Sequence, residues 1–182
     1  MIRGDMIKHI LQSIYKHPEK KNIFGYLIEI SAFKGVFGTT KELIDSEFAF
    51  QRYLKTTLGK QFVAFEQIIK FLRNVLSHST TSHIQLKTDD FIKQKDYLKK
   101  NVDTLIDFKF LYADAFPQWK GSKDYGIHIQ LDFKKMKDGQ SLFDLISLHQ
   151  LYLLTELCFN LSEIFRINTF PKKSTSPAQR KK

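Results

Sequence analysis

The hydrophobic period of the chain changes directly after His78. Before this residue, apolar side chains recur at spacings of three and four, the pattern of amphipathic helices. After it, several stretches alternate apolar and polar residues, the pattern of half-buried strands. We therefore expect a mainly α protein, a helical bundle with a small antiparallel β insertion between the helix that ends near His78 and the last long helix.

Four helices are predicted before the change of period, at about residues 6–14, 23–37, 39–58 and 62–78. The second is expected to stop at Gly38. Thr39 and Glu42 have the spacing of a capping box, so a third helix is predicted to begin there. Leu58-Gly59 interrupts the pattern, and the fourth helix follows with the most apolar face of the set.

The predicted strands lie within residues 83–134, where apolar residues alternate with polar ones at 84–86, 106–112 and, most strictly, 127–133. Asp138-Gly139 is predicted to form a turn. Ser141 and Asp144 again have capping-box spacing, which predicts a long helix over about 142–167. We expect one domain over residues 1–170, with 83–134 as its β-rich insertion. The basic, polar tail 171–182 is expected to be disordered.

Composition restricts the class of partner. The 182 residues are 42% hydrophobic, enough for a real core, and carry a formal charge of +10. A pI near 9.6 favours an anionic partner, which can be nucleic acid, an acidic protein or an anionic membrane. No stretch resembles a signal peptide or approaches the ~20 apolar residues of a membrane span. The sequence predicts a cytoplasmic protein without a membrane partner.

Cys158 is the only cysteine, so an internal disulfide and a cysteine-built zinc site are excluded. It stands in an apolar run and is expected to be a buried core residue. No glycine-rich phosphate loop, carboxylate pair with metal-ligand spacing or Ser-His-Asp arrangement stands out. We therefore predict neither a metal site nor a cofactor.

The segment 73–78, Arg-Asn-Val-Leu-Ser-His, carries the strongest chemical signal. Arginine is scarce in this lysine-rich chain and occurs only at positions 3, 52, 73, 166 and 180. Arg73 offers a planar fork of donors matched to phosphate, and His78 can move a proton near neutral pH. Asn74 can hold the histidine or a phosphate oxygen. These groups suffice to cleave RNA without a metal, although cations are also common at a solvated helix end.

The spacing of this pair constrains its geometry. On an ideal helix, residues five apart are rotated by ~140°, so Arg73 and His78 would not share a face. Either the helix unwinds around residues 77–80, whose Ser and Thr permit it, or two chains related by a two-fold axis bring both motifs into one cleft. The two solutions are compatible.

Arg73-Asn74-x-x-x-His78 at the end of a bundle helix resembles the R-x4-6-H signature of the HEPN superfamily, whose catalytic members are metal-independent ribonucleases. Many of those members are toxins or anti-phage abortive-infection effectors. The resemblance implies an endoribonuclease (a hydrolase giving 2′,3′-cyclic phosphate ends) with a composite site in a homodimer whose motif helices face each other. It also implies an antitoxin or other regulator. Thr80 stands where members paired with a nucleotidyltransferase antitoxin often carry tyrosine, which puts that type of antitoxin in doubt.

Four further residues are candidate RNA contacts: Ser77, His83, Trp119 and Lys120. His83 is close enough in sequence to join the cleft, and it can equally be a surface residue at the start of a strand. Residues 116–123 mix aromatics with lysines, as single-strand-binding surfaces do, and as the tip of an insertion also does. The lysines of 93–100 form a solvated helix face that can also supply phosphate contacts.

Two alternatives to a ribonuclease stay open from the sequence. One is a non-catalytic, basic, HEPN-like module that binds RNA or a partner protein. The other is an unrelated helical scaffold whose charge serves solubility or membrane contact.

Overall fold

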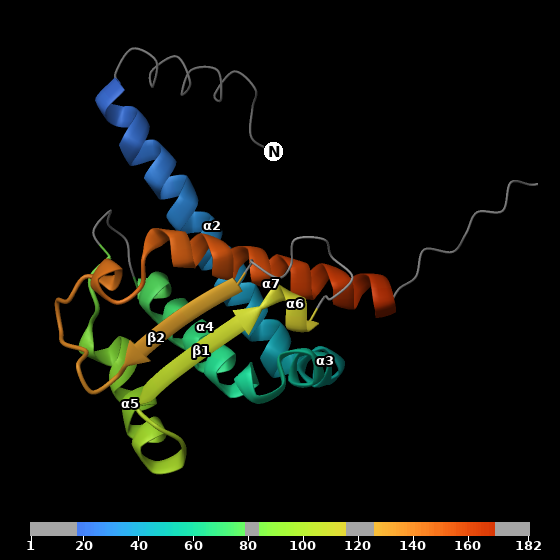
Figure 1. The fold of residues 1–182 in the computed structure, drawn as a ribbon. Coiled ribbons are helices and arrows are strands. Elements are labelled where there is room, and N and C mark those ends of the chain that lie inside the picture. Colours follow the sequence, from blue (N-terminus) through green and yellow to red (C-terminus); the bar gives the residue numbers. More distant parts are fainter. Residues whose placement is uncertain (1–17, 79–83, 116–125, 170–182) are drawn as a thin grey trace, which may run out of the picture.

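The computed structural model describes residues 18–78, 84–115 and 126–169, and it is mainly helical with one two-stranded antiparallel sheet (Figure 1). The order of the elements is α2 Pro18–Ser46, α3 Phe48–Leu58, the 3-10 turn η1 Gly59–Gln61, α4 Phe62–His78, α5 Thr88–Asn101, β1 Leu105–Leu111, α6 Tyr112–Ala115, β2 Gly126–Asp132, the 3-10 turn η3 Leu142–Asp144 and α7 Leu148–Thr169. The predicted helix at 6–14 and the predicted tail at 171–182 lie outside the described residues.

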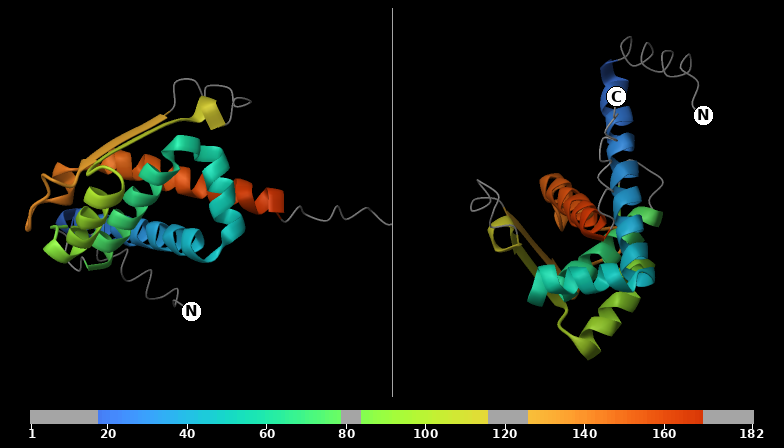
Figure 2. Two further views of the ribbon diagram at one scale, coloured as in Figure 1. Left: turned by 90° about the horizontal axis from the view of Figure 1, so that it is seen from below. Right: turned by 90° about the vertical axis from the view of Figure 1, so that its right-hand side faces the viewer.

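α2 is one continuous helix of 29 residues, which corrects the predicted stop at Gly38 and the predicted start at Thr39. The first half of α2 projects beyond the other helices (Figures 1 and 2). Phe33, Phe37 and Ile44 are all buried on one side of α2, so the same core holds the helix before and after the glycine. Burial of that face outweighs the low helix propensity of Gly38 and the capping-box spacing of Thr39 and Glu42. The break falls at Glu47 instead.

The predicted interruption at Leu58-Gly59 is confirmed. Gly59 has φ +51°, a left-handed conformation that favours glycine, and it ends α3. A short turn then leads into α4. α4 buries its apolar arc in the core and packs against α2 and β1, so it is the central helix of the described chain. Because α4 is fixed along its length, its last turn is held in place as well.

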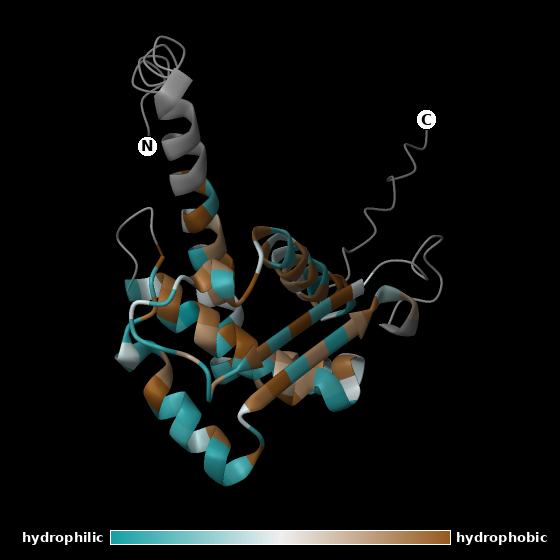
Figure 3. Cartoon of the chain, turned by 60° about the vertical axis from the view of Figure 1, so that its left-hand side comes forward, coloured by the Kyte–Doolittle hydropathy of each residue, from teal (hydrophilic) through white to brown (hydrophobic). Residues whose placement is uncertain are grey.

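The sheet consists of β1 and β2, joined in an antiparallel register that pairs Phe108 with Ile129. Figure 3 shows hydrophobic and hydrophilic residues alternating along both strands. The buried face of β1 rests on α4, where the rings of Phe108 and Phe65 lie 5.7 Å apart. The predicted strand at Ile84 and Leu86 is wrong, since this segment makes only an isolated bridge through Gln85.

α5 connects the motif helix to the sheet, so the insertion holds a helix as well as strands. Buried Gln94 of α5 donates from Nε2 to the backbone oxygen of Gln67 at 2.8 Å and to its side-chain oxygen at 2.9 Å. These bonds fix α5 on α4, because an amide buried without partners would cost about 1–3 kcal/mol.

The last long helix begins at Leu148 and not near residue 142, which corrects the predicted start. Ser141 does cap a helix through its side chain, but that helix is the short turn η3. The capping box of α7 is formed by Ser147 and Gln150: the Gln150 amide donates to Ser147 Oγ at 3.2 Å, and the Ser147 amide donates to Gln150 Oε1 at 2.8 Å. The predicted turn at Asp138-Gly139 is confirmed, with Gly139 at φ +73°.

Candidate functional site

The last turns of α4 present four polar residues to one side of the helix. Arg73, Asn74, Ser77 and His78 span an arc of ~140°, and the opposite arc carries the buried residues. Arg73, Ser77 and His78 are exposed, and Asn74 is half-buried. Arg73 and His78 therefore lie at the two edges of a single solvent-facing arc.

A buried carboxylate holds His78. Oδ1 of Asp90 lies 2.5 Å from Nδ1 of His78; Asp90 is 1% exposed, and the histidine side chain is 53% exposed. A carboxylate oxygen can only accept, so the hydrogen of the imidazole lies on Nδ1. Nε2 is left as the nitrogen able to exchange a proton with a bound molecule.

Asp90 is itself fixed by the start of α5. The backbone amide of Lys87 donates to its second oxygen, Oδ2, at 2.8 Å, and the Asp90 amide donates back to the Lys87 carbonyl oxygen at 2.9 Å. A carboxylate in the first turn of a helix is also stabilised by the positive end of the helix dipole. Both oxygens of the aspartate thus have a donor, and its orientation toward His78 is set by backbone.

Asn74 extends this arrangement to the arginine. Its Nδ2 donates to the backbone oxygen of Asp90 at 3.4 Å, and its Oδ1 accepts from Nη1 of Arg73 at 3.1 Å. One chain of contacts therefore runs from Arg73 through Asn74 and Asp90 to His78. The sequence left open whether Asn74 holds the histidine or a phosphate oxygen. In the structure, Asn74 is bonded to Arg73 and to the backbone of Asp90, the residue that contacts the histidine.

A lysine from another helix approaches the same helix end. Nζ of Lys34, on α2, donates to the carbonyl oxygen of Ser77 at 3.3 Å. The last carbonyls of a helix lack intrahelical donors, so a cation there is favoured. The contact places a second positive charge next to His78.

Chemically, these residues combine an oriented imidazole with fixed positive charge. A histidine whose Nδ1 is bonded to a carboxylate is a competent general base or acid at Nε2. The guanidinium of Arg73 can take two oxygens of one phosphate.

α4 keeps helical geometry through Ser77 and His78. Unwinding at these two residues, one of the two predicted ways to bring the pair together, is therefore not observed, and residues 79 and 80 lie outside the described chain. Of the other predicted contacts, His83, Trp119 and Lys120 also lie outside it.

Asp90 was not among the site residues predicted from the sequence. It is the second of two aspartates that follow Thr88 at the start of a helix, where acidic residues are common as caps. That signal indicates a helix start, and nothing in it indicates a contact with a histidine twelve residues earlier.

A second histidine–aspartate pair lies on the exposed face of the sheet. Nε2 of His128 is 2.7 Å from Oδ1 of Asp107, and both side chains are largely open to solvent. The hydrogen bond from His128, aided by the charge of Lys109, lowers the pKa of the Asp107 carboxyl below its ordinary value. His128 therefore lies on the outward, polar face of β2.

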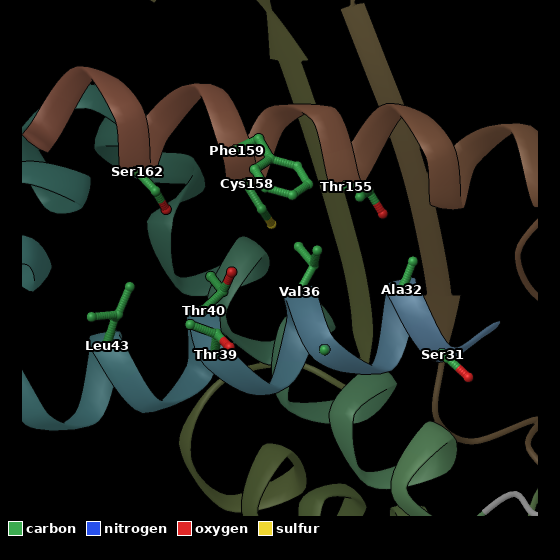
Figure 4. A pocket seen from close by; sticks show the side chains of 11 residues that line it. Ser31, Ala32, Val36, Thr39, Thr40, Leu43, Thr155, Cys158, Phe159 and Ser162 are labelled. Carbon is green, nitrogen blue, oxygen red and sulfur yellow. The ribbon is translucent and has the colours of Figure 1, made fainter. Parts of the chain in front are cut away.

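An apolar groove of about 450 Å³ lies between α2 and α7 (Figure 4). Its lining includes Gly35, Val36, Thr40, Cys158 and Phe159, and none of its lining residues is charged. Cys158 is buried, as predicted, and burial raises the pKa of its thiol to about 12. The groove therefore offers no group that exchanges protons near neutral pH.

Within residues 18–78, 84–115 and 126–169, no three His, Cys, Asp or Glu side chains gather as metal ligands would. No helix in the same part of the chain is both long and apolar enough to cross a membrane. No protein-family model, curated protein or solved structure matches the chain.

Proposed function

We propose that the chain is a metal-independent endoribonuclease of HEPN type, in which Arg73 binds the scissile phosphate and His78 transfers protons. The observation that carries the proposal is the contact between His78 and buried Asp90, which occupies Nδ1 of an exposed histidine and, among the described residues, leaves Nε2 without a hydrogen-bond partner. The position of the motif at the end of a central bundle helix also supports it, as does the chain of contacts that joins Arg73 to Asp90.

The reaction begins with the 2′-hydroxyl of RNA. One imidazole accepts its proton as the 2′-oxygen attacks the phosphorus, and the bond from phosphorus to the 5′-oxygen breaks. The departing 5′-oxygen takes a proton from an imidazolium, and the other product carries a 2′,3′-cyclic phosphate. Arg73 stabilises the negative charge on the phosphoryl oxygens. No metal enters these steps, since the protein supplies both the proton transfers and the positive charge.

A homodimer explains how two proton transfers occur in one turnover. If two copies of α4 meet about a two-fold axis, the cleft contains two histidines and two arginines. One histidine then serves as base and the other as acid. With such an activity, the protein could act as a toxin or anti-phage effector. An antitoxin or other regulator would then inhibit it.

The test is incubation of the purified protein with single-stranded RNA in EDTA. We expect internal cleavage with 2′,3′-cyclic phosphate ends, lost in Arg73→Ala and in His78→Ala. His128→Ala is the matched control, because it removes another exposed histidine paired with an aspartate and should leave cleavage unchanged. Undiminished cleavage by His78→Ala would overturn the mechanism. RNA binding that weakens with salt, without any cleavage, would instead support the non-catalytic binding module.

A further inference from the structure

Tyr97 is a half-exposed aromatic residue on the same side of α5 as Asp90. Seven residues separate the two, so they lie two turns apart and differ by only ~20° around the helix. Tyr97 is 47% exposed, so the core does not account for its ring. α5 thus carries the residue that orients His78 and, further along, an accessible aromatic surface.

One lysine lies near this ring, and a second lies one helical turn away. Nζ of Lys70 lies 5.7 Å from the centroid of the Tyr97 ring, and Lys70 is on α4 one turn before Arg73. Lys93 is exposed one turn before Tyr97 on α5. Two acidic residues stand one helical turn before these lysines, Glu66 before Lys70 on α4 and Asp89 before Lys93 on α5. Lys70 therefore lies beside the Tyr97 ring, and Arg73 follows it one turn farther along α4.

We propose that Tyr97, Lys70 and Lys93 form a binding subsite for single-stranded RNA, in which the Tyr97 ring stacks on a base next to the scissile phosphate. Stacking on an aromatic ring binds any base, and the two lysines attract the phosphates on either side of it. The subsite rests on the proposed function, since it is defined by its distance from His78.

The distance selects a flanking nucleotide. Lys70 and His78 are eight residues apart on α4, which is ~12 Å along the helix. The ring therefore lies to one side of the proton-transferring histidine, where a base adjacent to the scissile phosphate can reach it on an extended strand. Folded or paired RNA keeps its bases stacked on one another, so the subsite favours an unpaired strand.

The experiment measures binding without cleavage. A fluorescein-labelled oligomer of 2′-O-methyluridine lacks the attacking hydroxyl and cannot be cut by the proposed reaction. We expect Tyr97→Ala to weaken its binding about tenfold in fluorescence anisotropy, the size of a lost base–aromatic contact, and Tyr97→Phe to keep it. With a strand of the same length whose bases are removed, Tyr97→Ala and wild type should bind equally.

Phe48→Ala is the matched control. Phe48 is also an exposed aromatic beneath a cation, with Arg52 4.8 Å from its ring centroid, but it lies on α3 at the other end of the bundle (Figure 1). Its loss should not change binding. Equal binding by Tyr97→Ala and wild type, with cleavage in EDTA intact, would overturn the subsite alone. No binding by wild type would overturn it together with the ribonuclease.

Discussion

Asp90, the third residue of α5, holds His78, the last residue of α4, with Oδ1 2.5 Å from Nδ1. The aspartate is buried and bonded to the backbone at its other oxygen, whereas the histidine is open to solvent. A group that must exchange protons with a substrate is accessible, and the group that orients it is not. This asymmetry distinguishes the pair from His128 and Asp107, which are both exposed.

The contact fixes the tautomer of His78. We predict that nitrogen NMR shifts of the neutral ring will show hydrogen on Nδ1 and none on Nε2, since the carboxylate can only accept. In Asp90→Ala, the ring should return to the mixture of tautomers typical of a free histidine. His128, bonded through Nε2, should show hydrogen on that nitrogen in both proteins. Unchanged His78 shifts in Asp90→Ala would contradict the assignment.

A composite site in a homodimer can be tested by mixing variants. Arg73→Ala and His78→Ala are each expected to be inactive. Because the proposed cleft uses one histidine as base and the other as acid, a dimer of one wild-type chain and one His78→Ala chain should also be inactive. In an equal mixture of wild type and His78→Ala, half of the dimers are wild type before subunit exchange and a quarter after it, so activity should fall to about half on exchange. Undiminished activity after demonstrated exchange would show that one histidine suffices.

The continuity of α2 predicts opposite effects at two glycines. A Cβ at Gly38 would meet no atom within 4 Å, and the residue lies inside a helix. Gly38→Ala should therefore raise the free energy of unfolding by ~0.5–1 kcal/mol in urea denaturation. Gly59→Ala should lower it by ~1 kcal/mol, because Gly59 has φ +51°. Destabilisation by Gly38→Ala would indicate that the chain breaks there after all.

Burial of Cys158 predicts a loss of stability in alkali. The pKa of its thiol is about 12 in the folded chain, against 9.0 as the ordinary value. A raised folded pKa means that the stabilisation is complete below pH 9 and is lost as the pH rises toward 12, because only the unfolded chain ionises in this window. At pH 10, the unfolding free energy should have fallen by ~1.4 kcal/mol relative to pH 8.

Cys158→Ala isolates this contribution, since other groups titrate in the same range. The drop between pH 8 and 10, measured by urea denaturation, should be smaller in the variant by that amount. Identical drops in the two proteins would mean that the thiol is not buried in the folded chain.

The sequence predicts those elements whose hydrophobic pattern and local chemistry agree. α4 was predicted correctly because its pattern of apolar residues is long and regular. β1 and β2 were predicted correctly because apolar and polar residues alternate strictly along them. The predicted helix end at Gly38 was wrong because a glycine and a capping-box spacing are local signals. Burial of Phe37 and Ile44 on one face is instead a property of the folded core. The predicted start of α7 was wrong because Ser141 and Ser147 both have capping-box spacing, and the local sequence does not indicate which of the two serines begins the long helix.

For the candidate site, the sequence indicates only the residues that are close together along the chain. Arg73, Asn74 and His78 are close in sequence, so their types and spacing could be recognised. Asp90 could not, because its role depends on how the start of α5 packs against the end of α4. The sequence also implied that Arg73 and His78 do not share a helix face, without revealing that Asn74 and Asp90 connect them.

The most direct test of the account is the rate of RNA cleavage in EDTA by Asp90→Asn. Asparagine keeps a side-chain oxygen for the start of α5, but its amide can donate to Nδ1 and so favour the wrong tautomer of His78. We predict that kcat falls by about 100-fold or more while KM changes little, because substrate still binds Arg73. Wild-type kcat in a folded Asp90→Asn protein would contradict the central claim.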